Sequence, residues 1–195
     1  QEEGEALVAK FYRPERWSDA AILEEHSFCS ELAAQEIPVV APQQINGTTL
    51  HYAAGFRFAL FPRRGGRSPE LDDPATLEWI GRFIGRIHAV GRVSPFTERP
   101  ALTQVSFGEE PRNWLLEHGF IPPDLFEAWT TIAELALDGV KQAFERAGDI
   151  STLRLHGDCH PGNILWTPDG PHFVDFDDCR SGPAIQDLWM LLSGD

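Results

Sequence analysis

Three short apolar runs surround a polar segment between residues 152 and 176. The runs read TLRL, NILW and HFVDF, and the polar segment that leads into the second run reads HGDCHPGN. Short runs rich in Leu, Ile, Val and Phe, separated by Gly, Pro, Asp and Asn, are typical of strands joined by tight turns. We therefore expect a small folded unit that gathers the polar side chains of this segment in one place.

The polar segment has the spacing of a protein-kinase catalytic loop, H-x-D-x-x-x-x-N, with His156, Asp158 and Asn163 at the fixed positions. In such a loop the Asp orients the attacking hydroxyl and the Asn binds a metal ion. A second Asp must bind the metal that bridges the phosphates, and Asp175, twelve residues after Asn163, is the candidate. Alternatively, the segment is only a polar turn whose side chains satisfy the backbone.

The N-terminal part of the sequence indicates a small sheet with one helix. EALVAKFY, residues 5–12, is typical of a strand and carries Lys10. Ser18 favours the start of a helix, which we expect to run from about Asp19 to Gln35. Proline breaks, an NG turn signal and apolar runs in residues 37–61 predict strands of a small antiparallel sheet.

Glu25 lies in the middle of the apolar face of this predicted helix, at about 100° per residue. The apolar residues on that face are Ala21, Ile22, Phe28, Cys29, Leu32 and Ala33. A carboxylate there is costly to bury unless a cation meets it, and Lys10 on the preceding strand is the candidate. A kinase uses such a Lys–Glu pair to aim the lysine at the nucleotide phosphates. Glu24, about 100° away, ranks second, and the alternative is that Lys10 and Glu25 both lie on a solvated surface.

The remainder of the sequence predicts a second, mainly helical lobe. PRRGGRSPELDDP has the composition of a connector, so we place the boundary between lobes 1–62 and 63–195. Apolar residues at helical spacing predict helices over Ala75–Val90 and Pro123–Arg146, and GPAIQDLWMLL is expected to start a closing helix. The predicted fold class is therefore α+β.

The charge and cysteine content of the chain argue against several kinds of partner and site. Thirty acidic and sixteen basic residues give a net charge of −14, which disfavours nucleic-acid and anionic-membrane partners. No run approaches about eighteen apolar residues, and QEEGEALVAK has no signal-peptide pattern. The three cysteines form no CxxC pair, so neither a disulfide framework nor a zinc site is indicated. We expect a cytoplasmic monomer without nucleic-acid or membrane partners.

Five stretches together point to one family: VAKFYRPERW, ILEEH, GRFIGRIH, LRLHGDCHPGNILW and FVDFDDCRSGPAIQDLWMLLSGD. They resemble the aminoglycoside phosphotransferase and choline kinase-like superfamily and, within it, a family of bacterial Ser/Thr protein kinases linked to stress survival. The resemblance runs from about Glu5 to Asp195. It implies a bilobal, protein-kinase-like fold with ATP and Mg²⁺ as cofactors. Because family members run further at both ends, we expect this chain to be a fragment in which both lobes are incomplete.

The resemblance also implies roles for single residues. Asp158 would be the proton acceptor, while Asn163 and Asp175 would bind Mg²⁺, with Asp175 also belonging to the catalytic set. Lys10 would bind the nucleotide phosphates with Glu25 as its ion-pair partner. The adenine would lie against the connector, which makes cofactor-binding residues of Phe61 and Arg63.

Other polar residues near the motif receive simpler interpretations. His88 is expected to be a structural histidine, and Asp187, an awkward charge in an apolar segment, is expected to bond the backbone of the catalytic loop. Cys159 is expected to be a buried, inert thiol. Asp177 ranks above Asp178 as a further site residue, because alternation along a strand would put Asp177 on the same face as Asp175.

Four functions stay open on the sequence alone. The first is a protein Ser/Thr kinase, and the nearest alternative is a kinase of small hydroxyl compounds such as choline, homoserine, sugars or antibiotics, because the superfamily contains both. The third is a metal-dependent phosphoesterase with His156, Asp158, His160 and Asp175 as ligands. The last is a nucleotide-binding module without catalysis.

Overall fold

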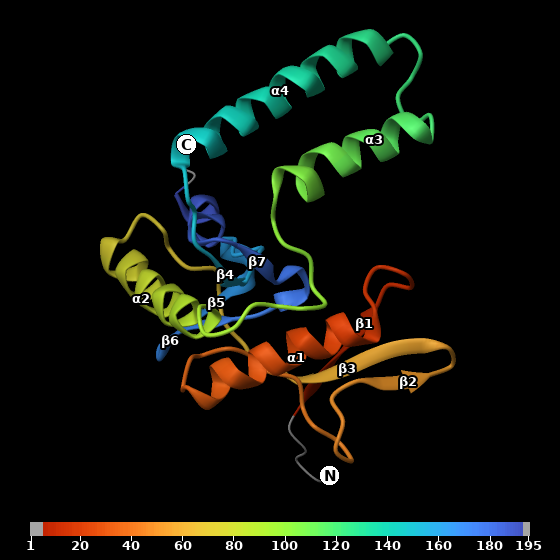
Figure 1. Cartoon of the computed structure of the whole chain (residues 1–195). Coiled ribbons are helices and arrows are strands. Elements are labelled where there is room, and N and C mark those ends of the chain that lie inside the picture. The colour runs from red at the N-terminus through yellow and green to blue at the C-terminus, as the bar shows by residue number, and fades with distance from the viewer. Residues whose placement is uncertain (1–5, 193–195) are drawn as a thin grey trace.

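The computed structural model describes residues 6–192, which combine helices with three small antiparallel sheets (Figure 1). The α+β class predicted from the sequence is confirmed. The first sheet has the order β1-β3-β2 and contains β1 (Leu7–Tyr12), β2 (His51–Ala53) and β3 (Phe56–Pro62). Lys10 on β1 pairs with Ala59 in the middle of β3, so a central strand position carries the candidate lysine.

The turn chemistry of this sheet differs from the prediction. The β2–β3 hairpin is closed by Ala54 and Gly55, which both have positive φ, at 50° and 83°. The predicted NG signal instead forms a separate tight turn, in which Asn46 and Gly47 lie between the paired residues Ile45 and Thr48. Two-residue turns of this kind need positive φ at both central positions, and each pair provides it. Within the region 37–61, the strands β2 and β3 both lie after residue 50.

Helix α1 (Asp19–Ala34) lies beside this sheet (Figure 1). Its N-terminus is capped by Ser18, whose Oγ accepts a hydrogen bond from the backbone N–H of Ala21 at 3.1 Å. The buried side chains of α1 include Ile22, Phe28 and Leu32, which confirms the predicted apolar face. The helix bounds agree with the prediction to within one residue at the C-terminal end.

Helix α2 (Pro74–Gly91) lies against the C-terminal strands. Asp73 caps it by accepting hydrogen bonds from the backbone of Ala75 and Thr76, at 3.2 Å each. The last turn passes so close to β4 (Thr152–Leu155) that a Cβ atom on Gly91 would lie 2.1 Å from the carbonyl oxygen of Arg154. Glycine at this position therefore lets the helix and the strand that leads into the polar segment 156–163 pack directly together.

The predicted strands around the polar segment belong to two separate two-stranded sheets. β5 (Ile164–Thr167) and β6 (Gly170–Phe173) make one, and β4 pairs with β7 (Arg180–Pro183), a strand that the sequence did not predict. The predicted closing helix is wrong within the described residues, because two 3-10 turns, Ala184–Asp187 and Trp189–Leu191, occupy that segment. Pairing of β7 with β4 draws the start of the segment into a sheet, so a helix cannot begin there.

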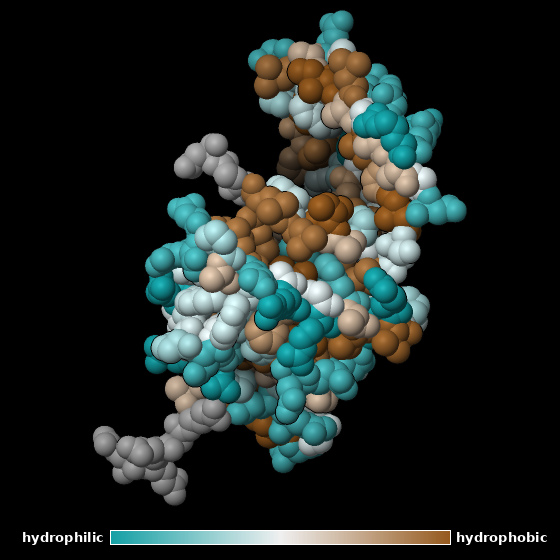
Figure 2. Space-filling model, turned by 90° about the vertical axis from the view of Figure 1, so that its left-hand side faces the viewer, coloured by the Kyte–Doolittle hydropathy of each residue, from teal (hydrophilic) through white to brown (hydrophobic). Residues whose placement is uncertain are grey.

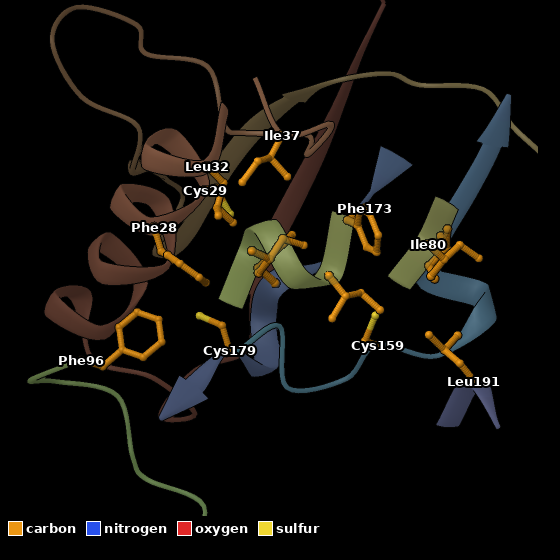
Figure 3. Close-up of a cluster of buried hydrophobic side chains, with 14 residues drawn as sticks. Phe28, Cys29, Leu32, Ile37, Ile80, Phe96, Cys159, Phe173, Cys179 and Leu191 are labelled. Carbon is orange, nitrogen blue, oxygen red and sulfur yellow. The ribbon is translucent and has the colours of Figure 1, made fainter. Parts of the chain in front are cut away.

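A buried apolar cluster joins the first sheet's helix to the rest of the chain (Figure 3). It contains Phe28 from α1, Ile80 from α2 and Phe173 from β6. Cys159 is fully buried in the same cluster, and burial raises the pKa of its thiol, as expected for an inert cysteine. The cluster continues across the predicted boundary between residues 62 and 63, so the two predicted lobes share core packing. The division itself stays a prediction.

Helices α3 (Glu110–Glu117) and α4 (Phe126–Ala147) form an arm that extends away from the other elements (Figure 1). α4 was predicted, whereas α3 and the π-helical turn before it, Val105–Glu109, were not. Neither helix contains a buried residue, and apolar atoms gather on the upper part of the molecule, where the arm lies (Figure 2). No helix within residues 6–192 is both long and apolar enough to cross a membrane.

Candidate active site

Lys10 contacts three carboxylates from distant parts of the chain. Its Nζ lies 3.2 Å from Glu25 Oε1, 3.0 Å from Asp175 Oδ1 and 3.2 Å from Asp177 Oδ1. Burial alone would lower the pKa of Lys10, but these three carboxylates outweigh it and raise the pKa. The ammonium group is therefore charged at neutral pH and lies between α1 and the segment that follows β6.

Glu25 is buried on the inner face of α1, with 1% of its side chain exposed. The alternative of a solvated surface pair is therefore wrong. Burial raises the pKa of Glu25, and the positive charges of Lys10 and Arg99 oppose that rise. Oε1 accepts the hydrogen bond from Lys10, while Oε2 has no hydrogen-bond partner among the described residues and faces Arg99 Nη1 at 3.7 Å. Two cations thus flank one buried carboxylate.

Asp158 and Asn163 meet across the turn that the polar segment forms. The Asn163 Nδ2 donates to the backbone oxygen of Asp158 at 2.9 Å and approaches its Oδ2 at 3.4 Å. The Asp158 side chain is 42% exposed, so a second molecule can reach its carboxylate. His160 Nε2 lies 3.7 Å from the same Oδ2.

The backbone of Val174 ties this turn to the next one. Val174 donates its N–H to the backbone oxygen of Asn163 at 3.0 Å, and its own backbone oxygen accepts from His156 Nε2 at 2.9 Å. Because Nε2 must carry the proton for that bond, Nδ1 is free to accept from the backbone N–H of Asp158, at 3.3 Å. Burial lowers the pKa of His156, which favours this neutral form. The histidine of the motif therefore shapes the loop.

Asp175 follows directly, in the left-handed region with φ 58° and ψ 65°. A non-glycine residue in this region is uncommon, although Asp tolerates it better than most, and it turns the carboxylate out of the strand direction. The side chain is 56% exposed and accepts from Lys10. Burial would raise the pKa of Asp175, but Lys10 outweighs it and lowers the pKa, so the carboxylate is ionised.

Two oxygen donors are thereby brought to one end of the β5–β6 hairpin. They are the side-chain amide oxygen of Asn163 and the carboxylate of Asp175. The backbone N–H of Val174, the residue before Asp175, bonds the backbone oxygen of Asn163 and holds the two chain segments side by side. Mg²⁺ prefers hard oxygen ligands and usually takes one or two from the protein, with phosphates and water supplying the others. The residues present therefore fit a magnesium ion bound together with nucleotide phosphates.

Asp187 holds the backbone at the start of the polar segment. Its carboxylate accepts hydrogen bonds from the backbone N–H groups of His156 and Gly157, at 3.0 Å and 2.8 Å, and from His88 Nε2 at 3.0 Å. The expected structural roles of Asp187 and His88 are confirmed by these contacts.

A cleft of about 380 Å³ opens beside Lys10. Its walls are formed by Val8, Lys10, Glu25, Cys29, Val40, Phe61, Pro62, Arg64, Leu165, Val174, Asp175 and Phe176. The predicted residue Phe61 is among them, whereas Arg63 is not and Arg64 takes that place. The backbone N–H of Arg63 instead donates to the Ala6 oxygen at 2.8 Å and continues the β1–β3 pairing. Mostly apolar walls with a few convergent polar groups are typical of a small-molecule site.

Two arginines of the site were not recognised from the sequence. Arg16, in the loop after β1, bonds Asp177 Oδ2 at 2.7 Å and Asp178 Oδ1 at 2.8 Å. Arg99 is buried and donates to the backbone oxygens of Ala21 and Cys179. The predicted order of the two aspartates agrees with the contacts, because Asp177 touches Lys10, but the reason given was wrong: Phe176–Asp178 is a 3-10 turn and not a strand. No local pattern marks an arginine that binds so far along the chain.

A metal cage made of protein side chains alone is not present in the described residues. Among residues 6–192, no three His, Cys, Asp or Glu side chains gather as metal ligands. The buried His156 bonds Val174 and Asp175 bonds Lys10, so the four residues proposed for a phosphoesterase do not form one cluster. The geometry favours a site completed by a nucleotide.

Comparison with known proteins agrees with this geometry. The family model of the phosphotransferase enzyme family (APH) matches residues 1–195. Stress response kinase A of Salmonella choleraesuis (strain SC-B67) is 48% identical over 194 residues, which covers 100% of this chain and 58% of the relative. A Salmonella typhimurium relative with the same identity and coverage is named serine/threonine protein kinase RdoA. The chain thus spans little more than half the length of the curated relatives it matches.

Solved structures share the fold at lower identity. The amicoumacin kinase hAmiN, in complex with AMP-PNP, Ca²⁺ and Ami, aligns with a TM-score of 0.76 at 23% identity and covers 98% of this chain and 58% of that one. A microcompartment-associated aminopropanol kinase aligns with a TM-score of 0.70 at 21% identity, over 96% and 62% of the two chains. These likenesses show a kinase-like fold. Since the family model spans the whole sequence, the chain belongs to the phosphotransferase enzyme family and is a homologue of stress response kinase A.

Proposed function

We propose that the polypeptide carrying this chain is an ATP- and Mg²⁺-dependent kinase that phosphorylates Ser or Thr hydroxyls of proteins. The observation that carries the proposal is the contact of one lysine, Lys10, with both Glu25 and Asp175 at the mouth of an apolar cleft. Phosphoryl transfer depends on positioned groups and on positive charge near the phosphates, and Lys10 is a positive charge held in place by carboxylates. The choice of a protein acceptor is supported by the name of the Salmonella typhimurium relative.

The nucleotide is expected to lie in the cleft between the first sheet, β1-β3-β2, and the β5–β6 hairpin. The apolar wall that includes Phe61 suits an adenine ring, and Arg63 lies just past the end of the same strand. Lys10 would bind the phosphates. In the structure described here its charge is met by Asp175 and Asp177, so an incoming phosphate would share the ammonium group with these carboxylates.

Asn163 and Asp175 are the residues that would hold Mg²⁺. Bound there, the ion would neutralise phosphate charge as transfer proceeds. The chain contributes the placement of these ligands. The bond from Val174 to Asn163 and the left-handed turn at Asp175 keep the two oxygen donors at the same end of the hairpin.

Asp158 would orient the acceptor hydroxyl and take its proton. Its carboxylate is accessible, and Asn163 holds it through two contacts of the same amide group. A carboxylate beside the attacking oxygen favours in-line attack on the γ-phosphate by aligning the hydroxyl. Asp187 binds the backbone N–H groups of His156 and Gly157, so the loop would hold one conformation before the substrate binds.

The test is transfer of labelled γ-phosphate from Mg·ATP by the full-length polypeptide to a generic protein substrate and to a panel of small alcohols. Asp158→Asn removes the base and keeps the shape, and Asp149→Asn, an exposed change after α4, is the matched control. We expect label on protein with the wild type and the control, and a loss of at least about a hundredfold with Asp158→Asn.

The same experiment separates the competing functions. Label confined to the small alcohols would replace the protein-kinase proposal with a small-molecule kinase. Release of inorganic phosphate from phosphate esters, without ATP, would favour the phosphoesterase. Binding of Mg·ATP without transfer to any acceptor would favour a nucleotide-binding module.

Three further statements belong to this proposal. We expect the protein to act in the cytoplasm, to be a monomer and to serve stress survival, the last because of the name of the Salmonella choleraesuis relative. Size-exclusion chromatography with light scattering would test the monomer, and a dimer mass would contradict it.

A further inference from the structure

Arg99 is a fully buried arginine that lies outside the helices and strands, with 0% of its side chain exposed. Its guanidinium group donates to three backbone oxygens: from Nε to Cys179 at 2.5 Å, from Nη1 to Ala21 at 3.0 Å, and from Nη2 to Asp177. It also stacks over the ring of Trp17, 4.2 Å from the centroid. A buried arginine with its donors satisfied in this way holds several chain segments together.

The three acceptors come from the two segments that form the Lys10 site. Ala21 lies in the first turn of α1, one helical turn before Glu25. Asp177 and Cys179 follow directly after Asp175. Arg99 therefore bridges the helix that carries one partner of Lys10 to the turn that carries the other two, and its Nη1 also lies 3.7 Å from Glu25 Oε2.

Glu24, the neighbour of Glu25, holds the segment that carries Arg99. Its Oε1 accepts from Thr97 N at 2.6 Å and Thr97 Oγ1 at 2.9 Å, and its Oε2 accepts from Glu98 N at 3.0 Å and Arg99 N at 2.9 Å. Burial would raise the pKa of Glu24, but these hydrogen bonds outweigh it and lower the pKa. The charged carboxylate is thus the form that binds this segment.

We propose that Glu24 and Arg99 are positioning residues for the nucleotide lysine. Glu24 binds the backbone of segment 97–99 to α1. Arg99, in that segment, donates hydrogen bonds both to α1 and to the turn after Asp175. The two residues fix the distance across which Glu25 and Asp177 meet Lys10. This inference rests on the proposed kinase function, because it assigns the consequence of that geometry to nucleotide binding and transfer.

The sequence pair Glu24–Glu25 thereby has two different tasks. Glu25 faces inward and bonds Lys10, whereas the Glu24 carboxylate accepts its hydrogen bonds from residues 97–99. The sequence ranked Glu24 second as a partner for Lys10, and the structure gives it this other contact. Asp158 is anchored separately, through Asn163 and the loop backbone that Asp187 holds, so a change at Glu24 leaves the acceptor side in place.

The test compares Glu24→Gln with Glu31→Gln in the full-length polypeptide. Both residues lie on α1, and Glu31 bonds Arg154 Nη2 at 2.7 Å, so its variant removes an ion pair of the same helix that does not reach Lys10. The measured quantities are kcat, the KM for ATP, the KM for the acceptor, the Kd for Mg·AMP-PNP and the melting temperature. Arg99→Lys, which keeps the charge and loses the planar fork, is measured in parallel.

We expect Glu24→Gln and Arg99→Lys to raise the KM for ATP and the Kd for the analogue between about tenfold and a hundredfold, because the lysine is misplaced. The KM for the acceptor should stay within about twofold, and Glu31→Gln should resemble the wild type. An unchanged KM for ATP and an unchanged Kd for the analogue in both variants, at a melting temperature like that of the wild type, would overturn the inference. An equal effect of Glu31→Gln would do the same.

The binding measurement keeps this inference separate from the proposed function. If the wild type binds the analogue but transfers no phosphate, the kinase proposal fails. Weaker binding by Glu24→Gln and Arg99→Lys, but not by Glu31→Gln, would still support the positioning role. If transfer occurs and the variants bind and react like the wild type, the positioning role fails and the kinase proposal stands. If the wild type binds no nucleotide, both fail.

Discussion

The carboxylate of Asp187 accepts a hydrogen bond from the backbone N–H of Gly157 at 2.8 Å, across thirty residues of sequence. The same side chain accepts from the backbone of His156 at 3.0 Å and from His88, so three donors meet two oxygens in a site that water does not reach. A carboxylate is an acceptor at both oxygens, and no neutral side chain of its size can replace it. The conformation of the proposed catalytic loop therefore depends on a residue outside it.

Asp187→Asn should lower both stability and phosphate transfer. The amide places a donor opposite a backbone donor, which leaves one buried N–H unsatisfied at a cost of about 1–3 kcal/mol. Urea denaturation would measure the free energy of unfolding, and γ-phosphate transfer would measure activity. Asp149→Asn, on the exposed surface, is the control and should change neither. Unaltered stability of Asp187→Asn would show that the three hydrogen bonds do not hold the loop.

Gly157→Ala should be far more damaging than an alanine at another glycine of similar positive φ. Gly157 has φ +86°, and a Cβ there would lie 2.1 Å from the carbonyl oxygen of Asp178. Gly55 has φ +83° with nothing within 4 Å, so it isolates the cost of the left-handed conformation, about 1–2 kcal/mol. We expect Gly157→Ala to lose about 1–3 kcal/mol more than Gly55→Ala in urea denaturation. Equal losses would mean that the turn relaxes without strain.

The sequence predicted the parts of the fold that depend on local pattern. Ser18 and the apolar spacing located α1, and the position of Glu25 within that face led to its contact with Lys10. The motif spacing led to the approach of Asn163 to Asp158. These features depend on helix periodicity and on short turns, which a single sequence records.

The unpredicted features depend on contacts that carry no local signal. Arg99 binds carbonyl oxygens about eighty positions away, and any residue can supply a carbonyl. β7 has the sequence RSGP, without β-branched or aromatic residues, and forms because β4 pairs with it. At the predicted closing helix, Gly182 and Pro183 belong to β7, and the apolar residues after them form 3-10 turns. The left-handed turn at Asp175 likewise follows from its surroundings.

Lys10→Met and Glu25→Gln should not be additive. Lys10→Met leaves the buried Glu25 carboxylate with Arg99 alone, at 3.7 Å, and we expect a loss of about 2–4 kcal/mol, below the usual value for a fully buried pair because Lys10 is 23% exposed. Adding Glu25→Gln removes the uncompensated charge, so the double variant should be more stable than Lys10→Met. Phosphate transfer should stay lost in both.

A double-mutant cycle in urea would measure this coupling, with each variant compared at the same pH and ionic strength. A coupling energy of about 1 kcal/mol or more is expected for two charged groups in contact. Losses that simply add would show that Glu25 is satisfied without Lys10, for example by moving toward Arg99. Recovery of transfer in the double variant would contradict the role proposed for Lys10.

Stability should fall in acid through His26. This residue is 2% exposed, with Nε2 2.7 Å from the Tyr12 hydroxyl and Nδ1 2.8 Å from Thr49 Oγ1. Burial, with smaller contributions from the positive charges of Lys10 and Arg99, lowers the pKa of His26 from 6.5 to about 4. Between these two values the unfolded chain binds a proton that the folded chain does not, so folding becomes less favourable as the pH falls from 6.5 toward 4.

His26→Gln should remove this part of the pH dependence, because the amide can hydrogen-bond but does not titrate. We expect the wild type to be the more stable protein at pH 7, where the histidine is neutral in both states and packs well. From pH 7 to pH 4.5 its advantage in unfolding free energy should shrink by about 2 kcal/mol, since each unit of pKa difference corresponds to about 1.4 kcal/mol. Carboxylates that titrate in the same range act on both proteins and cancel in the difference. Urea denaturation at several pH values would measure the two curves, and curves that stay parallel would show that His26 is protonated as readily in the folded chain as in the unfolded one.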